Sequence, residues 1–159
     1  PADRLVGNWR LVRWSAEVDD RPVKPFGGVT SGLLTYTPEG RMWGTLMRVD
    51  REPVDGHTLA AAPADQRALA AAGYLNYAGS YRVEGSTVIH SVEVSLFPNW
   101  IGGDQHRSME WVENERGGLD LVLSARSTTD EGTSTYNRLQ WRRLEEWDQT
   151  TEDAETQTG

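Results

Sequence analysis

The chain contains no cysteine, which excludes disulfide bonds, thiolate nucleophiles and cysteine-bound metals. It also lacks an apolar run of the ~20 residues that a membrane-spanning helix requires. No signal peptide is recognisable in the sequence. We therefore expect a cytoplasmic protein without a membrane partner.

Positive charge is scarce in this chain. Its 16 Lys and Arg residues are outnumbered by 24 Asp and Glu residues, so the formal net charge is −8. Nucleic acids and anionic membrane surfaces bind clustered Lys and Arg side chains. The charge balance therefore argues against a nucleic-acid partner.

Familiar signatures of metal, cofactor and nucleophilic chemistry are also missing. The three histidines, His57, His90 and His106, show no metal-binding spacing such as His-x-x-x-His. The sequence contains no Gly-x-Ser-x-Gly elbow, no Gly-rich phosphate loop and no dinucleotide fingerprint. We therefore expect neither a metal nor any other cofactor.

Glycine and tryptophan, by contrast, are abundant, with 16 and 7 residues among 159. Glycine at regular intervals is typical of the turns between short strands, and tryptophan supplies a large, rigid contact area. The two together indicate a β architecture with an aromatic interior. Segments bounded by turn residues predict eight strands, at residues 8–18, 31–37, 41–48, 77–83, 86–97, 104–113, 119–126 and 133–143.

Nearly all of the predicted strands are joined as sequential hairpins. Residues 37–40 have Pro early and Gly last, and Glu84-Gly85 fits a two-residue turn. This order favours an all-β, up-and-down antiparallel barrel, since closure removes exposed sheet edges. A barrel of eight strands can either fill its interior with side chains or hold one small ligand.

A single helix is predicted at residues 63–75, between the third and fourth strands. The segment is rich in Ala, and Asp65 in its first turn suits the helix dipole. Leu69, Ala72 and Leu75 form a short apolar stripe. A helix inserted between hairpins in this way favours a position across the barrel mouth.

The length of the chain favours one domain. We expect residues 1–147 to form a single barrel domain. The remaining residues, 148–159, are Thr, Glu, Gln, Asp and Gly with no apolar residue except Ala154. This composition predicts a disordered acidic tail.

Two motifs carry a resemblance to a known family. Gly7-Asn8-Trp9 resembles the Gly-x-Trp opening of lipocalin-type barrels, and residues 97–100 form a Phe-Pro-Asn-Trp corner. With the segments at residues 32–42, 46–48 and 73–81, they make residues 5–143 similar to the bacterial and fungal lipocalin-like domain family.

The resemblance implies a fold and a range of functions. In lipocalin-type barrels the tryptophan plugs the closed end and packs against an arginine of the last strand, which implies Arg138 or Arg142 here. Some similar barrels bind hydrophobic compounds, and others act as cyclases or isomerases in natural-product pathways. The fold alone does not choose between these roles.

Residues 90–107 concentrate polar side chains of the kind found in buried sites. Strand alternation places Glu93 on one face with Ser91 and Ser95. A carboxylate in mid-strand requires water or a partner, and Arg107 is available across the corner. Two interpretations follow: a solvated ion pair outside the sheet, or a polar wall inside the barrel that orients a ligand.

The face occupied by Arg107 bears on this choice. Gln105 and Arg107 share a face with Met109 and Trp111, which are large apolar residues of the same strand. If that face points into the barrel, Arg107 points inward too. This favours slightly the interpretation in which Glu93 and Arg107 lie in a cavity.

His90 lies on the opposite face from Glu93, with Val92, Val94 and Leu96. A lone histidine beside aliphatic side chains is most often a core residue satisfied by one hydrogen bond. Alternatively, it serves as a general acid or base with a pKa suited to neutral pH. One cavity can contain His90 or Glu93 but not both, unless a bulge reverses the alternation.

Three functional hypotheses remain open. The first is a cofactor-independent cyclase or isomerase that orients a polyketide- or terpenoid-like intermediate, with Glu93, Arg107 and His90 as catalytic candidates. The second is a non-catalytic carrier of a small apolar ligand, and the third is a filled barrel that serves as an interaction module. We favour the first, because polar residues are dense between Glu93 and Arg107.

The expected partner is a small hydrophobic molecule, and a homodimer is compatible with the sequence. Trp100 and Trp111 are the expected fluorescent reporters of binding. The candidate ligand-binding residues are aromatic and polar side chains of the strands and the corner: Tyr36, Trp43, Tyr77, Tyr81, Ser95, Phe97, Trp100, Gln105, Met109 and Trp111.

Overall fold

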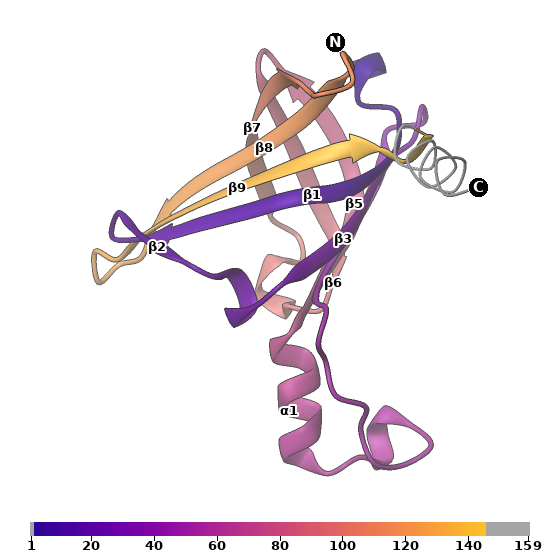
Figure 1. Ribbon diagram of the computed structural model, residues 1–159, viewed down its shortest axis with the longest axis vertical. Helices are drawn as coiled ribbons and strands as arrows, with labels where there is room; N and C mark the ends of the chain where they lie inside the picture. The colour runs from indigo at the N-terminus through magenta and orange to yellow at the C-terminus, as the bar shows by residue number, and fades with distance from the viewer. Residues whose placement is uncertain (1, 146–159) are drawn as a thin grey trace, which may run out of the picture.

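A single antiparallel sheet closes on itself in the computed structural model, which describes residues 2–145 (Figure 1). The predicted tail at 148–159 lies outside the described residues. In the described part of the chain the strands are β1 (Gly7–Val18), β2 (Arg21–Val23), β3 (Thr30–Tyr36), β4 (Arg41–Arg48), β5 (Tyr74–Glu84), β6 (Thr87–Ser95), β7 (Asp104–Glu113), β8 (Leu119–Thr128) and β9 (Ser134–Arg143).

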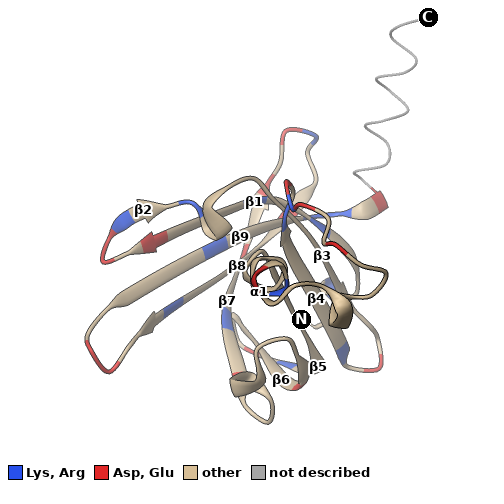
Figure 2. Ribbon diagram, turned by 90° about the horizontal axis from the view of Figure 1, so that it is seen from below, with Lys and Arg blue, Asp and Glu red and all other residues tan. Residues whose placement is uncertain are grey.

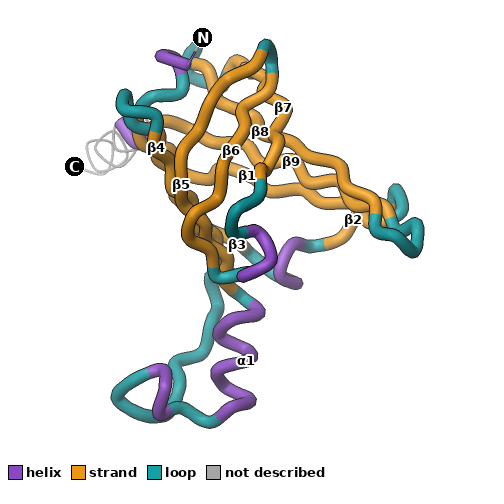
Figure 3. Tube along the Cα trace, turned by 180° about the vertical axis from the view of Figure 1, so that it is seen from behind, coloured by secondary structure: helices purple, strands orange, loops and turns teal. Residues whose placement is uncertain are grey.

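Closure depends on the long strand β1, which pairs with β3 on one side and with β9 on the other. Strands β1 and β3–β9 thus form the eight-stranded up-and-down barrel that the hairpin order predicts. From β3 to β9 each strand pairs with the next one in the chain (Figure 3). The connections are short except between β4 and β5. The all-β barrel prediction is confirmed.

Strand β2 is an additional short strand that the sequence analysis did not predict. It forms a hairpin with the end of β1, through a turn in which Asp19 and Asp20 have φ of 48° and 59°. Two left-handed residues in a row suit the twist of a hairpin, and Asp tolerates this conformation. Pro22 lies within β2 and is accommodated because β2 is at the edge of the sheet.

The end of the barrel near the N-terminus is filled by side chains. Leu5, Trp9, Tyr36, Met42 and Leu121 are among its core residues, each at most 1% exposed. Packing of this kind excludes water, and burial of each large apolar side chain contributes roughly 1.5–3 kcal/mol. This end therefore anchors the fold and leaves the other end free to hold a cavity.

Trp9 plugs the filled end as the resemblance implied, but its arginine partner is a different one. The guanidinium of Arg143 lies 4.3 Å from the centre of the Trp9 ring, and it donates to the carbonyl oxygen of Val6 at 2.9 Å. The prediction of Arg138 or Arg142 was wrong. Arg143 is the direct β9 partner of Trp9, whereas Arg142 bonds Asp120 and Arg138 aligns with Ser15 much further along β1.

The connection between β4 and β5 forms an arm at the other end of the barrel. It contains the short 3-10 helix η3 (Leu59–Ala61) and the helix α1 (Ala64–Ala72). α1 ends at Gly73 because Tyr74 and Leu75 already belong to β5, so the predicted helix at residues 63–75 extended too far. No helix in the described residues is long and apolar enough to span a membrane.

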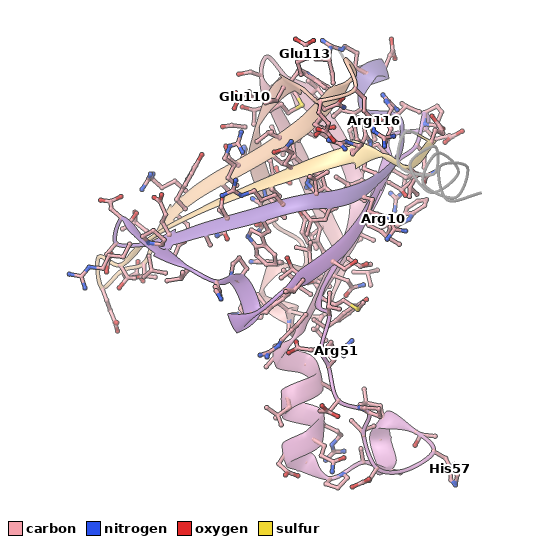
Figure 4. All side chains as sticks on the ribbon, in the orientation of Figure 1. Arg10, Arg51, His57, Glu110, Glu113 and Arg116 are labelled. Atoms are coloured by element: carbon pink, nitrogen blue, oxygen red, sulfur yellow. The ribbon has the colours of Figure 1, made fainter. Side chains whose placement is uncertain are left out.

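The arm starts at the mouth end, as predicted, but α1 points away from the barrel rather than lying across it (Figures 1 and 3). α1 has no buried residue, and Leu69 is 74% exposed. The predicted apolar stripe does not exist as a helix face: Leu69 and Ala72 are exposed, whereas Leu75 belongs to β5 and lines the barrel interior. His57 lies at the far tip of the arm, away from the barrel interior (Figure 4).

Candidate functional site

A cavity of about 600 Å³ lies inside the barrel, toward the end from which the arm projects. Strands β1 and β3–β9 all contribute to its wall. Its apolar wall is formed mainly by Trp14, Leu34, Leu46, Leu75, Trp100, Leu123, Leu139 and Trp141. Its polar wall includes Asn76, Tyr77, His90, Gln105, Arg107 and Asn137.

A buried hydrogen-bonded chain crosses the barrel beside this cavity. The Tyr36 hydroxyl lies 2.7 Å from Nε2 of His90, and the Tyr77 hydroxyl lies 2.7 Å from Nδ1. The three side chains come from β3, β6 and β5, and His90 is only 1% exposed. A polar group buried this deeply requires such partners, because an unpaired one costs about 1–3 kcal/mol. His90 is thus a satisfied interior residue that also reaches the cavity.

The imidazole of His90 is uncharged at neutral pH. Burial lowers the pKa of His90 to about 3, and the nearby charge of Arg107 contributes to the shift. This result contradicts the expectation of a pKa suited to acid–base catalysis at neutral pH. A neutral imidazole has one N–H donor and one acceptor nitrogen, so one tyrosine donates to it and the other accepts from it.

The number of partners available to each hydroxyl assigns which tyrosine donates to His90 and which accepts from it. Within the described residues the Tyr36 hydroxyl has no hydrogen-bond partner other than His90, and Tyr36 is 1% exposed. Its proton is therefore satisfied only if Tyr36 donates to Nε2. Nδ1 of His90 then carries the proton and donates to the Tyr77 oxygen, which leaves the Tyr77 O–H free to donate into the cavity.

Arg107 adds a positive charge to the same wall. It donates to Oε1 of Gln105 at 3.1 Å and to the carbonyl oxygen of His106 at 2.9 Å, which are both neutral acceptors. Burial raises the pKa values of Tyr36 and Tyr77, and the Arg107 charge opposes both shifts. The cavity therefore presents a neutral hydroxyl donor and a cationic donor close together.

Glu93 does not take part in this site. Its carboxylate accepts two hydrogen bonds of 2.7 Å from Arg41, and about half of each side chain is exposed. The predicted pair between Glu93 and Arg107 is therefore wrong. Arg107 does line the cavity, as its face with Met109 and Trp111 indicated, and His90 rather than Glu93 accompanies it.

A β-bulge explains the position of Glu93. Opposite β5, the register shifts so that Ala78 pairs with Val94 and Gly79 pairs with Val92, which leaves Glu93 without a direct partner. The extra residue reverses the alternation along β6. As a result, Ser95 pairs with Tyr77 and His90 pairs with Tyr81, two residues on the same face of β5. Ser95 and His90 therefore share a face, although regular alternation would place them on opposite faces.

The other predicted ligand-binding residues fall into three groups. Those at or beside the cavity are Tyr36, Tyr77, Trp100 and Gln105. Those packed in the filled end are Tyr81, Met109 and Trp111. Those on the outside or at the corner are Trp43, which is 47% exposed, Phe97, which is 45% exposed, and Ser95, which bonds the backbone at Asn76 and Phe97.

Sequence reasoning missed Trp14, Asn76 and Asn137 as cavity residues. Trp14 donates from Nε1 to Oδ1 of Asn137 at 2.9 Å across the β1–β9 pair. A second register shift, between Leu11 and Arg13, lies between Trp9 and Trp14 on β1. The inward direction of Trp14 therefore could not be counted from Trp9 by simple alternation.

The uncharged state of His90 leads to a prediction about pH. The unfolded chain binds a proton at this histidine below about pH 6.5, whereas the folded protein does so only near pH 3. Stability is therefore complete above pH 6.5 and decreases as the pH falls toward 3, by up to about 1.4 kcal/mol per unit. Urea unfolding should show a loss of about 2 kcal/mol between pH 6.5 and 5.

His90→Gln provides the control for this prediction, because glutamine can both donate and accept but does not titrate. The variant should be less stable than the wild type at pH 7.5 and should lose little further stability at pH 5. An equal loss in both proteins would show that another group causes the pH dependence.

Comparison with known proteins agrees with this architecture. The family model of the lipocalin-like domain matches residues 6–144, so the chain belongs to the lipocalin-like domain family. Among curated proteins it is similar to the 4'-hydroxy-3'-methoxypropiophenone carrier protein ppsC of Aspergillus oryzae. The two are 31% identical over 111 residues, which cover 65% of this chain and 96% of the relative. No solved structure matches the chain.

Proposed function

We propose that this protein binds a small, mostly apolar molecule with a carbonyl or phenol oxygen in its barrel cavity. The observation that carries the proposal is a cavity whose apolar wall faces two donors, the Tyr77 hydroxyl and the Arg107 guanidinium. The relative supports it, since its name describes it as the carrier of an aromatic ketone that also bears a hydroxyl group.

The size and chemistry of the cavity fit this class of ligand. A volume of about 600 Å³ lies within the range of pockets for small organic ligands. The leucine and tryptophan side chains would exclude water from an aromatic ring, and Tyr77 and Arg107 would bind its oxygen. A ligand without an oxygen would exclude water from the Tyr77 hydroxyl and leave this donor unpaired, at a cost of about 1–3 kcal/mol.

Tryptophan fluorescence tests the proposal. Trp14, Trp100 and Trp141 line the cavity, whereas Trp111 lies in the filled end, 6.0 Å from Trp9, and is not the expected reporter. Titration with 4'-hydroxy-3'-methoxypropiophenone should quench the emission with saturation. Trp100→Phe should reduce the amplitude of quenching, whereas Trp43→Phe, on the outer surface, should reduce the total emission but not the ligand-dependent change.

A variant that fills the cavity provides a second test of the same proposal. Ala125 lies in the cavity wall, so Ala125→Trp should weaken binding by tenfold or more, about 1.4 kcal/mol. Leu33→Trp adds the same side chain on the outer face of β3, where Leu33 is 45% exposed, and should bind normally. Binding that is equal in both variants would place the ligand outside the barrel and contradict the proposal.

A cofactor-independent cyclase or isomerase is the second candidate function. It is favoured by the convergence of Tyr77 and Arg107, since two donors at one carbonyl oxygen stabilise negative charge that develops there. The described residues of the cavity wall include no Asp or Glu, and both nitrogens of His90 are occupied. These features suit a cyclisation promoted by orientation and carbonyl polarisation better than one that requires a strong base.

This second function is tested with a linear polyene that carries a conjugated ketone. If the protein is a cyclase, it should accelerate intramolecular cyclisation of the probe, and Tyr77→Phe should remove much of the acceleration. Product formation is followed by chromatography against the uncatalysed reaction. A rate equal to the uncatalysed rate, with binding intact, would leave the carrier function alone.

A further inference from the structure

From the charges of the cavity wall we infer that the site selects acidic phenols or enols conjugated to a carbonyl and binds them as anions, with the charged oxygen at Arg107 and Tyr77. The inference rests on the proposed function and names the ligand class more narrowly. In such compounds the hydroxyl and the carbonyl oxygen are the two ends of one delocalised anion. Either end can therefore occupy the donor pair.

The first argument is the sign of the charge inside the barrel. The chain as a whole has a net charge of −8, yet the described residues of the cavity wall include Arg107 and Arg126 and no Asp or Glu. Elsewhere, charged residues of both signs occur along the strands and in the turns (Figure 2). The charge of the cavity wall is thus positive, opposite in sign to the net charge of the chain, and favours an anionic ligand.

The second argument is that the charge of Arg107 is not compensated. Among the described residues no carboxylate lies within 4.0 Å of Arg107, and its partners are neutral: the side-chain oxygens of Gln105 and Tyr77 and a backbone carbonyl. Arg126 at the same cavity, by contrast, lies 3.5 Å from Asp20 and over the ring of Tyr136. A partly buried guanidinium without a counter-ion binds an anion more strongly than a neutral oxygen.

The third argument concerns the proton between Tyr77 and the ligand. Burial keeps the Tyr77 hydroxyl protonated, because it raises the pKa of this group. A phenol conjugated to a carbonyl is a stronger acid than tyrosine. When the two oxygens share a hydrogen bond, the ligand therefore carries the negative charge and Tyr77 donates. In the tautomer assigned above, Tyr77 accepts from Nδ1 of His90, 2.7 Å away, and its own proton is left for the ligand.

The experiment measures the pKa of a bound probe. 4'-Hydroxy-3'-methoxypropiophenone absorbs at a longer wavelength as the phenolate, so a pH titration of its absorbance gives this pKa free and bound to the full chain. An opposite charge within hydrogen-bonding reach lowers the pKa of an acid by about 1–3 units. The bound probe should therefore have a lower pKa than the free probe. A shift of one unit means that the protein binds the anion about tenfold more tightly than the neutral phenol.

Arginine variants and a blocked probe provide the controls. Arg107→Met should abolish the shift and Arg107→Lys should retain part of it, whereas Arg41→Met, which removes an arginine from the outer surface, should leave it intact. The 4'-O-methyl ether of the probe cannot ionise. It should bind the wild type more weakly than the phenol near neutral pH, and it should bind Arg107→Met with little change.

The outcomes separate this inference from the proposed function. A bound pKa equal to or above that of the free probe, with both probes bound, would overturn the inference and leave the binding function standing. Failure of both probes to bind, with no difference between Ala125→Trp and the wild type, would overturn the proposed function itself. If Arg107→Met does not fold, the wild-type shift and Arg107→Lys still decide the question.

Discussion

Replacing Gly79 with alanine should strongly destabilise the barrel, although it adds only a methyl group. A Cβ atom at this position would lie 1.9 Å from the carbonyl oxygen of Ser91 and 2.9 Å from its carbonyl carbon. Both are backbone atoms of the adjacent strand, which cannot rotate away as a side chain does. Relief of the clash requires separation of β5 from β6 at the bulge, where Glu93 is the extra residue.

We expect Gly79→Ala to lower the free energy of unfolding by about 3 kcal/mol or more, at the upper end of overpacking costs. Urea or thermal unfolding followed by circular dichroism measures the loss. Gly103→Ala is the matched control, because a Cβ there would be 3.5 Å from its nearest neighbour, an ordinary contact. Similar unfolding midpoints for the two variants would mean that β6 does not pack closely against Gly79 and would contradict the prediction.

Arg142→Met should also cause a large loss of stability, through an orphaned carboxylate. Asp120 is fully buried, and Arg142 donates to it from Nε and from one terminal nitrogen, each at 3.0 Å. Asn114 and Gln140 donate to the same carboxylate at 3.0 and 2.7 Å. Loss of the arginine would leave a buried charge with neutral donors only, at a cost of about 3–5 kcal/mol.

The pKa of Asp120 fixes the direction of the accompanying pH effect. Burial raises this pKa, but hydrogen bonds from Arg142, Asn114 and Gln140 outweigh burial and hold it below its ordinary value of 3.8. A lowered folded-state pKa stabilises the protein above the unfolded-state value, and this contribution is lost as the pH falls through the folded-state value. In Arg142→Met, the free energy of unfolding should therefore depend much less on pH in the acidic range than in the wild type.

Equilibrium unfolding at neutral pH compares Arg142→Met with Arg82→Met. Arg82 pairs with Glu84 and Asp104 on the surface, where its side chain is 50% exposed, so its loss should cost only about 0–1 kcal/mol. The double variant Arg142→Met with Asp120→Asn should recover part of the stability. Equal, small losses in both single variants would show that Asp120 is not dependent on its arginine.

The relation between sequence and structure is clearest along β6. The turn signal at Glu84-Gly85 located this hairpin to within one residue: Glu84 pairs with Thr87, so the turn residues are Gly85 and Ser86. Turn conformations depend on a few adjacent residues, which makes them readable from the sequence. The direction of each side chain was harder to predict. The register shifts at Gly79 and after Leu11 each reverse the alternation. A glycine inside a strand, such as Gly79, is typical of a bulge, but it does not tell which residue of the partner strand is the extra one.

The candidate site illustrates the same limit. The face shared by Arg107, Met109 and Trp111 correctly predicted that Arg107 is inward, since apolar residues of one strand share its buried side. The partner of Arg107 could not be found in this way. Glu93 was expected to meet Arg107 across the corner, but across the sheet it meets Arg41. The groups near Arg107 in space come from β3 and β5.

The sequence by itself therefore determined the eight-stranded barrel, the position of the inserted helix along the chain and the tryptophan at the filled end. These follow from local turn chemistry, residue periodicity and motif resemblance. Only the tertiary structure decided which polar side chains meet in the cavity. Tyr36, Tyr77, His90 and Arg107 come from four strands, and their assembly depends on barrel closure, inter-strand register and the bulge at Gly79, which are properties of paired strands.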